Sequence, residues 1–190
     1  MCGRYRFTEE QSKEIRKIIE EVERKYGEKA VRSGEIRPTA KAPVLTASEG
    51  GPSPELYTWG FRLPNSLVIN ARAETAMEKP MFRESVVRRR CVVPSTGFWE
   101  WDADKRKYFF TLSGAQELYM AGLYDVRDGI SYFCILTTAA NESMREVHGR
   151  MPLILTKSQI VPWLQEANSA RELLYAVPPD LKKRSCACGS

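Results

Sequence analysis

Short apolar segments, each ended by glycine, proline or small polar residues, fill the chain from about residue 41 onward. Segments of this length with turn residues between them are typical of β-strands. "APVLTA" and "ELYTWGF" flank the turn-forming stretch "SEGGPSP", and "KYFFTL", "ELYMAGLYDV" and "SYFCILTTA" follow. A series of about seven such strands with scattered helices predicts an α+β fold whose sheet is mostly antiparallel and barrel-like.

The clearest helical pattern comes before these strands, in "TEEQSKEIRKIIEEVERKYG". Apolar residues recur at helical spacing from Ile15 to Tyr26, while the opposite face is charged. Thr8 with Gln11 three positions on fits a capping box, and Gly27 is suited to end the helix. We expect this helix and a few shorter ones, in "KPMFRESVVRRR", "NESMREVHG" and "TKSQIVPWL", to lie at the periphery of the sheet.

The length of the chain, 190 residues, suits one domain with a sizeable core. No internal repeat and no interdomain linker is visible, so we predict a single domain over residues 2–179. The remaining segment, 180–190, reads "DLKKRSCACGS" and consists mostly of polar and small residues. It predicts a flexible C-terminal tail.

The chain is mildly basic, with a formal net charge of +5 and a pI near 9.0. This balance permits an anionic partner without requiring one. No apolar run approaches the roughly 20 residues of a membrane span, and the N-terminus lacks the apolar region of a signal peptide. The five cysteines have no framework spacing, which predicts reduced thiols in a cytoplasmic protein.

The chain begins "MCGRY", which places a cysteine directly after Met1. Removal of Met1 would leave Cys2 with a free α-amine and a thiol on adjacent carbons. That pair is either an accident of sequence or a reactive group, and this segment alone does not decide between them.

Three polar residues stand out within the apolar pattern. In "FWEW", strand alternation puts Glu100 on the same face as Phe98. That position predicts either a carboxylate beside the core, suited to acid–base chemistry, or an edge residue with its head in water. His148, the only histidine, lies between a predicted helix and a strand, where catalytic and capping residues both occur. Asn70 ends the apolar run "LVIN" and must find hydrogen-bond partners, for function or for structure.

Seven fragments, in this order, resemble the motifs of the SOS-response-associated peptidase (SRAP) family: "MCGRY", "WG", "INARAET", "RRCVVPSTGFWEW", "YMAGLYD", "ILTTAAN" and "VHGRMPLIL". The resemblance runs from residue 2 to about residue 179. Members of that family cross-link covalently to abasic sites in single-stranded DNA. The resemblance therefore implies a monomer that acts on single-stranded DNA containing abasic sites, without cofactor, metal or membrane, in the cytoplasm and associated with the nucleoid.

The resemblance also implies catalytic roles. Cys2 matches the N-terminal nucleophile, which would form a Schiff base through its amine and then a thiazolidine through its thiol. Asn70 matches the asparagine of the "NAR" motif at the reacting centre. Glu100 matches the acidic residue of "GF-[YW]-EW", and His148 the histidine of "H-x-R-x-P". Lyase activity by β-elimination and self-processing that removes Met1 are further expectations.

Four residues match DNA-contacting positions of the family. Arg4 and Arg72 match arginines that bind the backbone, Arg150 belongs to the "H-x-R-x-P" motif, and Thr138 lies in a matching "TA" segment. Binding through arginines and phosphates implies an affinity that falls with salt.

Three features differ from the family pattern. The stretch "FRLPNSLVINARAET" after "WG" lacks the longer, Trp-containing loop of relatives. Glu35 stands where asparagine is usual, and Gly149 where aspartate is frequent. These differences concern the preferred DNA junction and the orientation of His148.

Other functions stay open on the sequence. Cys2, His148 and Glu100 also fit the nucleophile, base and orienting group of a thiol protease. A module that binds single-stranded DNA without a covalent step is a further alternative. Cys186 and Cys188 give weak support for a metal site, since zinc sites usually need four ligands.

Two further features have both a DNA-binding and a structural interpretation. Trp59, Trp99 or Trp101 can stack on bases or belong to the core. The run "RRR" at 88–90 fits a DNA-binding patch or a helix end with solvated cations.

Overall fold

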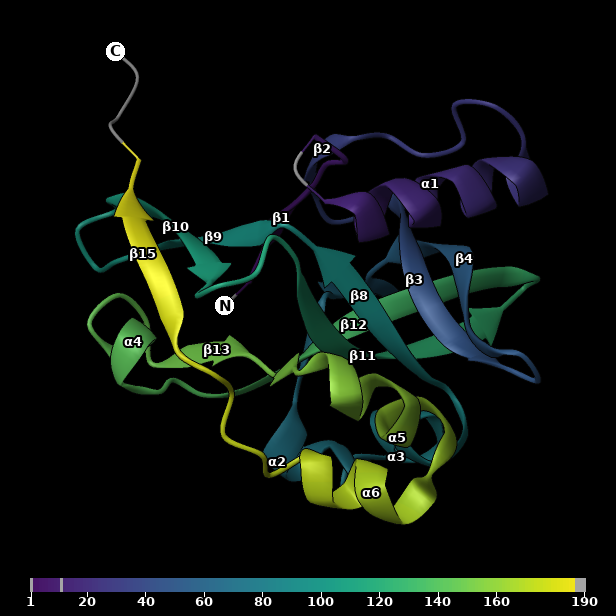
Figure 1. Ribbon diagram of the computed structural model, residues 1–190. Coiled ribbons are helices and arrows are strands. Elements are labelled where there is room, and N and C mark those ends of the chain that lie inside the picture. The colour runs from purple at the N-terminus through teal and green to yellow at the C-terminus, as the bar shows by residue number, and fades with distance from the viewer. Residues whose placement is uncertain (1, 11, 187–190) are drawn as a thin grey trace.

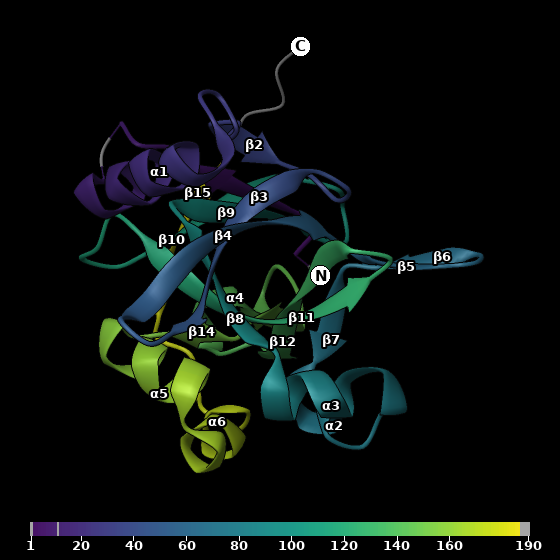
Figure 2. The ribbon, with the colours of Figure 1, turned by 90° about the vertical axis from the view of Figure 1, so that its right-hand side faces the viewer.

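Two β-sheets form the centre of the computed structural model, which describes residues 2–10 and 12–186. Five strands of the larger sheet close into a barrel in the order β12 (Ile130–Ala139), β4 (Gly51–Trp59), β3 (Lys41–Ser48), β8 (Arg90–Ser95) and β11 (Leu118–Arg127), with β11 pairing back to β12. The barrel is seen in Figure 2. The predicted α+β fold with a barrel-like sheet is confirmed.

The barrel is antiparallel except where β12 pairs with β4, and β7 (Asn70–Arg72) also runs parallel to β12. The predicted strand "LVINA" is therefore split in two. Its first part, β6 (Ser66–Val68), pairs with β5 (Phe61–Leu63) in a two-stranded ribbon that projects from the barrel (Figure 2). Its second part, β7, reaches the barrel and carries the "NAR" motif there.

Two short strands extend the larger sheet. β13 (Arg150–Pro152) pairs with the end of β12, and β14 (Ile154–Leu155) pairs with β11. The predicted strand "MPLIL" is therefore divided between two neighbours, and its first part continues along the same edge of β12 as β11, opposite the edge that pairs with β7.

The second sheet has five antiparallel strands in the order β15 (Leu181–Ser185), β10 (Lys107–Leu112), β9 (Gly97–Trp101), β1 (Arg4–Phe7) and β2 (Gly34–Ile36). It lies beside the barrel in Figure 1, and the chain passes from barrel to sheet directly at the junction of β8 and β9. Strands from both ends of the sequence therefore meet in one sheet.

The tail predicted over 180–190 is wrong for the residues of β15. Leu181–Ser185 pair with β10 along five residues, and Leu181 is buried against the core at 7% exposure. Cross-strand hydrogen bonds hold the polar residues that follow, so a polar composition did not prevent order here. Residues 187–190 of the predicted tail lie outside the described residues.

Helix α1 (Lys13–Tyr26) covers one side of the barrel next to β3 and β4 (Figure 1). Its N-cap is Ser12, whose hydroxyl accepts a hydrogen bond from the Ile15 N–H at 3.2 Å, and not Thr8 as predicted. Gln11 of the predicted capping box lies outside the described residues. The helix buries Ile15, Ile18 and Val22 of its apolar stripe, whereas Tyr26 at its end is exposed. It ends at Gly27, which has φ +98°, as the sequence predicted.

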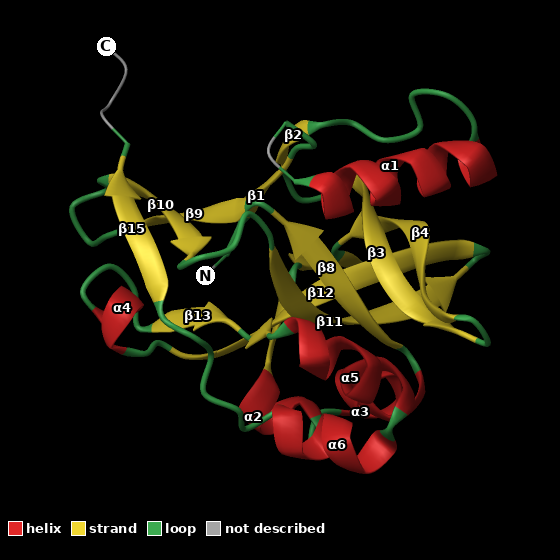
Figure 3. Cartoon of the chain, viewed as in Figure 1, coloured by secondary structure: helices red, strands yellow, loops and turns green. Residues whose placement is uncertain are grey.

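Five further α-helices are described, and Figure 3 shows all of them around the strands. They are α2 (Ala73–Ala76), α3 (Pro80–Arg88), α4 (Glu142–Arg145), α5 (Ile160–Gln165) and α6 (Ala167–Leu173); a 3₁₀ turn, Lys157–Gln159, precedes α5. Helix α6 was not predicted from the sequence. None of the helices described is long and apolar enough to cross a membrane.

One core is shared by the barrel and the second sheet. Trp59 of β4 is fully buried between them, with its ring centroid 5.2 Å from Tyr5 and 6.2 Å from Phe133. Its indole N–H donates to the Ile69 carbonyl at 3.1 Å. Trp59 is therefore a core residue and unable to stack on bases.

The run "RRR" at 88–90 is partly structural. Arg90 is buried, and its guanidinium donates to backbone carbonyls at the end of α3 and in α5, including Val86 at 2.8 Å and Leu164 at 3.0 Å. Arg89 lies 3.0 Å from Glu84 and 3.4 Å from Asp125. These contacts tie α3 to its neighbours, so the run is not a DNA-binding patch of three arginines.

Candidate active site

Cys2 lies at the entrance to β1, with its side chain only 1% exposed. The side-chain amide of Asn70 donates to the Cys2 carbonyl oxygen at 3.1 Å. Asn70 reaches this position because β7 pairs with β12, with Asn70 opposite Ile135. The barrel and the start of the chain thus meet at two of the predicted catalytic residues.

Glu100 lies in β9 and is buried at 5% exposure, on the same side as Phe98. One of its carboxylate oxygens accepts a hydrogen bond from the Trp101 N–H at 3.2 Å. Of the two interpretations left open by the sequence, the carboxylate beside the core is the one observed.

Two features of its surroundings raise the pKa of the Cys2 thiol. Burial raises the pKa of the Cys2 thiol well above its ordinary value, and the negative charge of Glu100 raises it further. The Cys2 Sγ lies 3.8 Å from the Arg4 carbonyl oxygen. The thiol is therefore protonated at neutral pH and must lose its proton to a base when it attacks.

His148 lies in the turn between α4 and β13, as predicted, and is half-buried. Its Nδ1 lies 2.9 Å from the Arg150 backbone N, which can donate to it, and 3.1 Å from the Arg150 carbonyl oxygen, to which only a protonated Nδ1 could donate. A neutral imidazole that accepts at Nδ1 has its proton on Nε2. Of the two tautomers, the one that presents an Nε2–H donor is therefore the one that keeps the shorter of these contacts as a hydrogen bond.

Arg150 and Thr138 meet in one network around Glu74 of α2. The Arg150 guanidinium donates to both Glu74 carboxylate oxygens, at 2.7 and 2.9 Å, and to the Thr137 carbonyl at 2.6 Å. Thr138 Oγ1 lies 3.5 Å from the same carboxylate. The hydrogen bonds from Arg150 lower the pKa of Glu74. Arg150 is thus held by the Glu74 carboxylate, for which no role was predicted from the sequence.

Arg72 and Arg4 lie on different parts of the site. Arg72 is exposed at the end of β7, opposite Thr137 of β12. Arg4 lies 3.6 Å from Glu35, the residue that departs from the family pattern, and its guanidinium carbon is 5.1 Å from the Trp101 ring centroid.

Six of the eight predicted site residues fall into two groups, and Arg4 and Arg72 belong to neither. Cys2 is connected to Asn70 by a hydrogen bond and to Glu100 by the effect of that carboxylate on the thiol. Arg150 is connected to His148 through its backbone N–H, and to Thr138 through the carboxylate that both side chains approach. The first group carries the candidate nucleophile, and the second carries the candidate proton donor.

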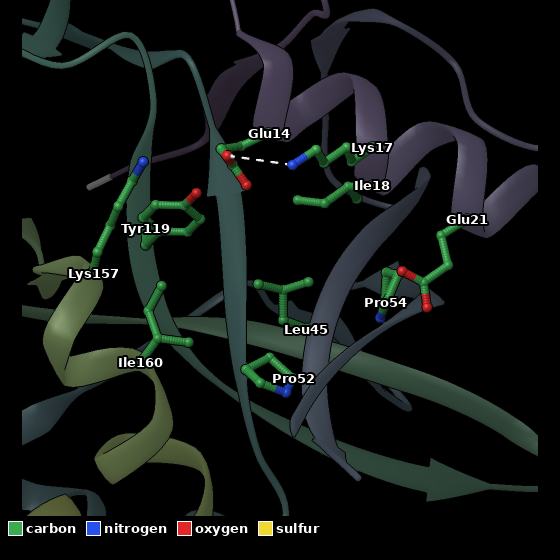
Figure 4. A pocket seen from close by; sticks show the side chains of 10 residues that line it. All are labelled: Glu14, Lys17, Ile18, Glu21, Leu45, Pro52, Pro54, Tyr119, Lys157 and Ile160. Atoms are coloured by element: carbon green, nitrogen blue, oxygen red, sulfur yellow. Dashed lines mark ion pairs between the residues drawn. The ribbon is translucent and has the colours of Figure 1, made fainter. Parts of the chain in front are cut away.

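A hollow of about 440 Å³ beneath α1 contains none of the predicted site residues. Figure 4 shows Leu45, Pro52 and Ile160 at its floor and charged side chains from α1 at its rim. The nearby Glu14 and Lys17 lie 4.0 Å apart. Hollows with an apolar floor often hold a ligand, but the predicted site residues of this chain lie elsewhere.

Within residues 2–10 and 12–186, no three His, Cys, Asp or Glu side chains are grouped so that they could hold a metal ion. Cys186 of the C-x-C pair is a free thiol of intermediate exposure. Cys188 lies outside the described residues.

The fold and the site define a class of protein: a closed β-barrel with an adjoining sheet that places a protonated thiol beside a buried carboxylate and an amide. The chain belongs to the SOS response associated peptidase (SRAP) family, whose model matches residues 1–187. The sequence-based assignment to this family is confirmed.

Named relatives agree with this family. "Abasic site processing protein YoqW" of Bacillus subtilis (strain 168) is 32% identical over 199 residues, which cover 93% of this chain and 86% of the relative. "Abasic site processing protein YedK" of Escherichia coli (strain K12) is 26% identical, covering 90% and 83%. A crystal structure of a protein from Bacteroides thetaiotaomicron matches with a TM-score of 0.80 at 24% identity, covering 98% of this chain and 93% of that one, and supports the fold.

Proposed function

We propose that this protein processes abasic sites in single-stranded DNA, as a monomer, by cross-linking to them covalently through Cys2. The observation that carries the proposal is the position of Cys2. Its carbonyl accepts a hydrogen bond from Asn70, and the negative charge of the Glu100 carboxylate raises the pKa of its buried thiol. The names of the relatives, abasic site processing proteins, support the choice of substrate class.

The first step uses the α-amine of Cys2, which becomes free once Met1 is removed. An opened abasic site presents an aldehyde at C1′, and an amine adds to an aldehyde with loss of water to give an imine. An α-amine has a pKa of about 7.7–8.0, so a useful fraction is neutral and nucleophilic at physiological pH. A lysine amine, with a pKa of about 10.4, is far less available.

The second step closes a ring. The Cys2 sulfur adds to the imine carbon, the thiol proton passes to the imine nitrogen, and a five-membered thiazolidine forms. Because amine and thiol belong to one residue, this closure is intramolecular and gains the advantage of proximity, on the order of 7–11 kcal/mol in favourable cases. We assign this proton transfer to Glu100, since the negative charge of its carboxylate raises the pKa of the Cys2 thiol.

The remaining residues bind and open the sugar. The His148 Nε2–H is suited to donate to the ring oxygen of the closed hemiacetal, and the same group assists β-elimination. Asn70 orients Cys2 through its carbonyl. Arg4, Arg72, Thr138 and Arg150 bind the flanking DNA, with the exposed Arg72 the most accessible of them.

A thiol protease would use a cysteine thiolate as its nucleophile, and such cysteines have lowered pKa values. The raised pKa of the Cys2 thiol argues against this alternative. A purely non-covalent binder would have no need of Cys2. Both alternatives can be tested together with the cross-linker.

The experiment is intact-protein mass spectrometry, with and without an oligonucleotide that contains an abasic site, followed by a denaturing gel. We expect Met1 to be absent and the mass to rise by that of the oligonucleotide less one water. Cys2→Ala should abolish the stable adduct, whereas the matched control Cys186→Ala should retain it. A chain extended ahead of Cys2 should form no adduct either, because its α-amine is blocked. An adduct with Cys2→Ala would refute the proposal, as would its absence in wild type.

A further inference from the structure

One face of the five-stranded sheet combines aromatic rings with cations. Strand alternation places Trp99 and Trp101 on the opposite side of β9 from Glu100. We call this surface the outer face, and it consists of Arg4, Arg6, Trp99, Trp101, Lys107, Phe109 and Arg184.

The strand register aligns these residues across the sheet. Arg4 of β1 is opposite Trp99 of β9, Trp99 is opposite Phe109 of β10, and Phe109 is opposite Arg184 of β15. A second pair, Trp101 and Lys107, lies next to this row. With strands about 4.8 Å apart, four strands give a row roughly 14 Å long.

The contacts along the outer face are continuous. The Lys107 ammonium lies 5.5 Å from the Trp101 ring centroid and 4.9 Å from that of Trp99. The rings of Trp99 and Phe109 are 5.0 Å apart, and the Arg6 and Arg184 guanidinium carbons lie 4.4 and 5.9 Å from the Phe109 centroid. Arg6 covers one side of a ring that is itself 4% exposed. Cationic side chains thus flank and cover a row of aromatic rings on this surface.

Positive charge exceeds negative charge on this face. Glu35 is shared by three cations, Arg37 at 2.6 Å, Arg4 at 3.6 Å and Lys107 at 4.0 Å. Further along, burial and the charge of Arg184 both lower the pKa of Arg6, while Glu10 acts in the opposite direction. Two guanidinium groups that repel each other over one ring would be stabilised by a bound anion.

We infer that the outer face binds the single-stranded DNA next to the lesion, through phosphates on Arg6, Lys107 and Arg184 and through bases on Trp99. Single-stranded nucleic acid carries a phosphate and a flat base in every unit, which matches a surface where cations border aromatic rings. The inference rests on the proposed function, which fixes where the DNA strand leaves the active site. Trp101 directly follows Glu100, and Arg4 lies two residues from Cys2, so both are next to the proposed reaction centre. The strand that leaves the site therefore meets Arg4 and Trp101 first and the outer face next.

The experiment measures fluorescence anisotropy with undamaged oligothymidylates, one short and one long enough to reach across the outer face, over a series of salt concentrations. For wild type we expect the longer strand to bind more tightly. In the double variant Arg6→Gln with Arg184→Gln, the tighter binding of the longer strand should be lost. The slope of log K against log salt should become shallower by about 1.4, because each cation contributes ~0.7 for a single strand.

The matched control is Arg16→Gln with Arg24→Gln, which removes two exposed arginines from α1 and should leave both the gain and the slope unchanged. Lys107→Gln serves as a second variant with a single charge removed. The inference is overturned if the Arg6 and Arg184 variant binds the longer strand with wild-type affinity and slope. Adduct formation by wild type on a short abasic oligonucleotide is scored separately, so a failure of the proposed cross-link is distinguishable from a failure of the outer face.

Discussion

The neighbours of Cys2, rather than its burial alone, distinguish it from the other cysteines. Cys91 and Cys134 are also fully buried, and burial raises the pKa of both thiols. They lie in strands β8 and β12 of the barrel and belong to its core. Among the cysteines that the structure describes, only Cys2 combines a carboxylate that acts on its thiol with an amide on its carbonyl. A reactive cysteine in this chain is therefore recognised by its polar contacts.

Replacing Glu100 by glutamine keeps the shape of the side chain and removes its capacity to accept a proton. We expect Glu100→Gln to slow thiazolidine formation by roughly 10²-fold, the lower end of what general acid–base catalysis contributes. Quenched time courses on denaturing gels measure this rate. Glu117→Gln is the matched control, because Glu117 is similarly buried but pairs with Ser12 and Lys157. Equal rates for Glu100→Gln and wild type would remove Glu100 from the mechanism.

The same environment predicts slow alkylation of Cys2. Iodoacetamide reacts with thiolates, and the Cys2 thiol is both buried and raised in pKa, whereas Cys186 is partly exposed. We expect peptide mapping of the native protein to find Cys186 modified well before Cys2, with the order lost in denaturant. Rapid modification of native Cys2 would show that the thiol is more accessible to solvent, or has a lower pKa, than its contacts indicate.

At the scale of elements, the sequence predicted what depends on local pattern. Strands β3, β4 and β8 to β12 follow from apolar segments with turn residues between them, and α3 from Pro80 near its first turn and the cations at its end. The parallel pairing of β4 and β7 with β12 was not predictable, because it brings together segments more than 60 residues apart. The residues of β15 resemble a tail in the sequence because they are mostly polar, and their order comes from pairing with β10, which the sequence does not reveal. The start of α1 was misplaced because two capping residues, Thr8 and Ser12, compete within a few positions.

The candidate site also contains both features that the sequence predicted and features that it did not. The motifs located Cys2, Asn70 and Glu100, which the fold brings together. They did not reveal that Arg150 is held by Glu74, since these residues are 76 positions apart. A signal was present, because Glu74 follows the "NAR" motif by two residues, but its partner depends on the pairing of β7 and β13 with β12.

The Ser12 cap joins α1 to the barrel. Its hydroxyl accepts from the Ile15 N–H at 3.2 Å and donates to Glu117 at 3.0 Å, and the residue is buried. Ser12→Ala should lower the free energy of unfolding by about 1–2 kcal/mol, the upper range for loss of a cap. Urea denaturation measures the change, with the exposed Ser66→Ala as control. A change no larger than that of the control would contradict the capping role.

The order of β15 depends on Leu181, the buried residue at its start. Leu181→Ala should destabilise the protein by about 2 kcal/mol, the lower range for a buried leucine, because the site lies on an edge strand that can relax. Lys182→Ala, its exposed neighbour, should have little effect. Thermal unfolding distinguishes the two variants, and similar melting temperatures would indicate that β15 contributes nothing to stability.

At the scale of the whole molecule, the site spans the two sheets. Glu100 and the strand that follows Cys2 belong to the five-stranded sheet, whereas Asn70 and Arg150 belong to strands attached to the barrel. The shared core around Trp59 fixes one sheet against the other. Mutations in that core should therefore affect reactivity as well as stability, because the catalytic geometry depends on both sheets.

The Glu74–Arg150 pair links α2 to β13 on the barrel side, and its contribution should depend on pH. The pKa of Glu74 in the folded protein is lowered from its ordinary value of 4.5. A group with a lowered folded pKa stabilises the protein above its unfolded pKa, and this stabilisation is lost as pH falls through the folded pKa. Wild type should therefore be more stable than Glu74→Gln at neutral pH, and the difference should shrink below about pH 4.5.

Urea denaturation at a series of pH values measures this difference directly. Glu142→Gln is the control, because Glu142 pairs with Arg145 on an exposed helix and is 83% exposed, where solvent screens the interaction. A stability difference between wild type and Glu74→Gln that stays constant from neutral to acidic pH would mean that the pair acts through shape and hydrogen bonding rather than through charge. Because Arg150 also holds the His148 ring through its backbone N–H, loss of the pair at low pH should reduce adduct formation over the same pH range.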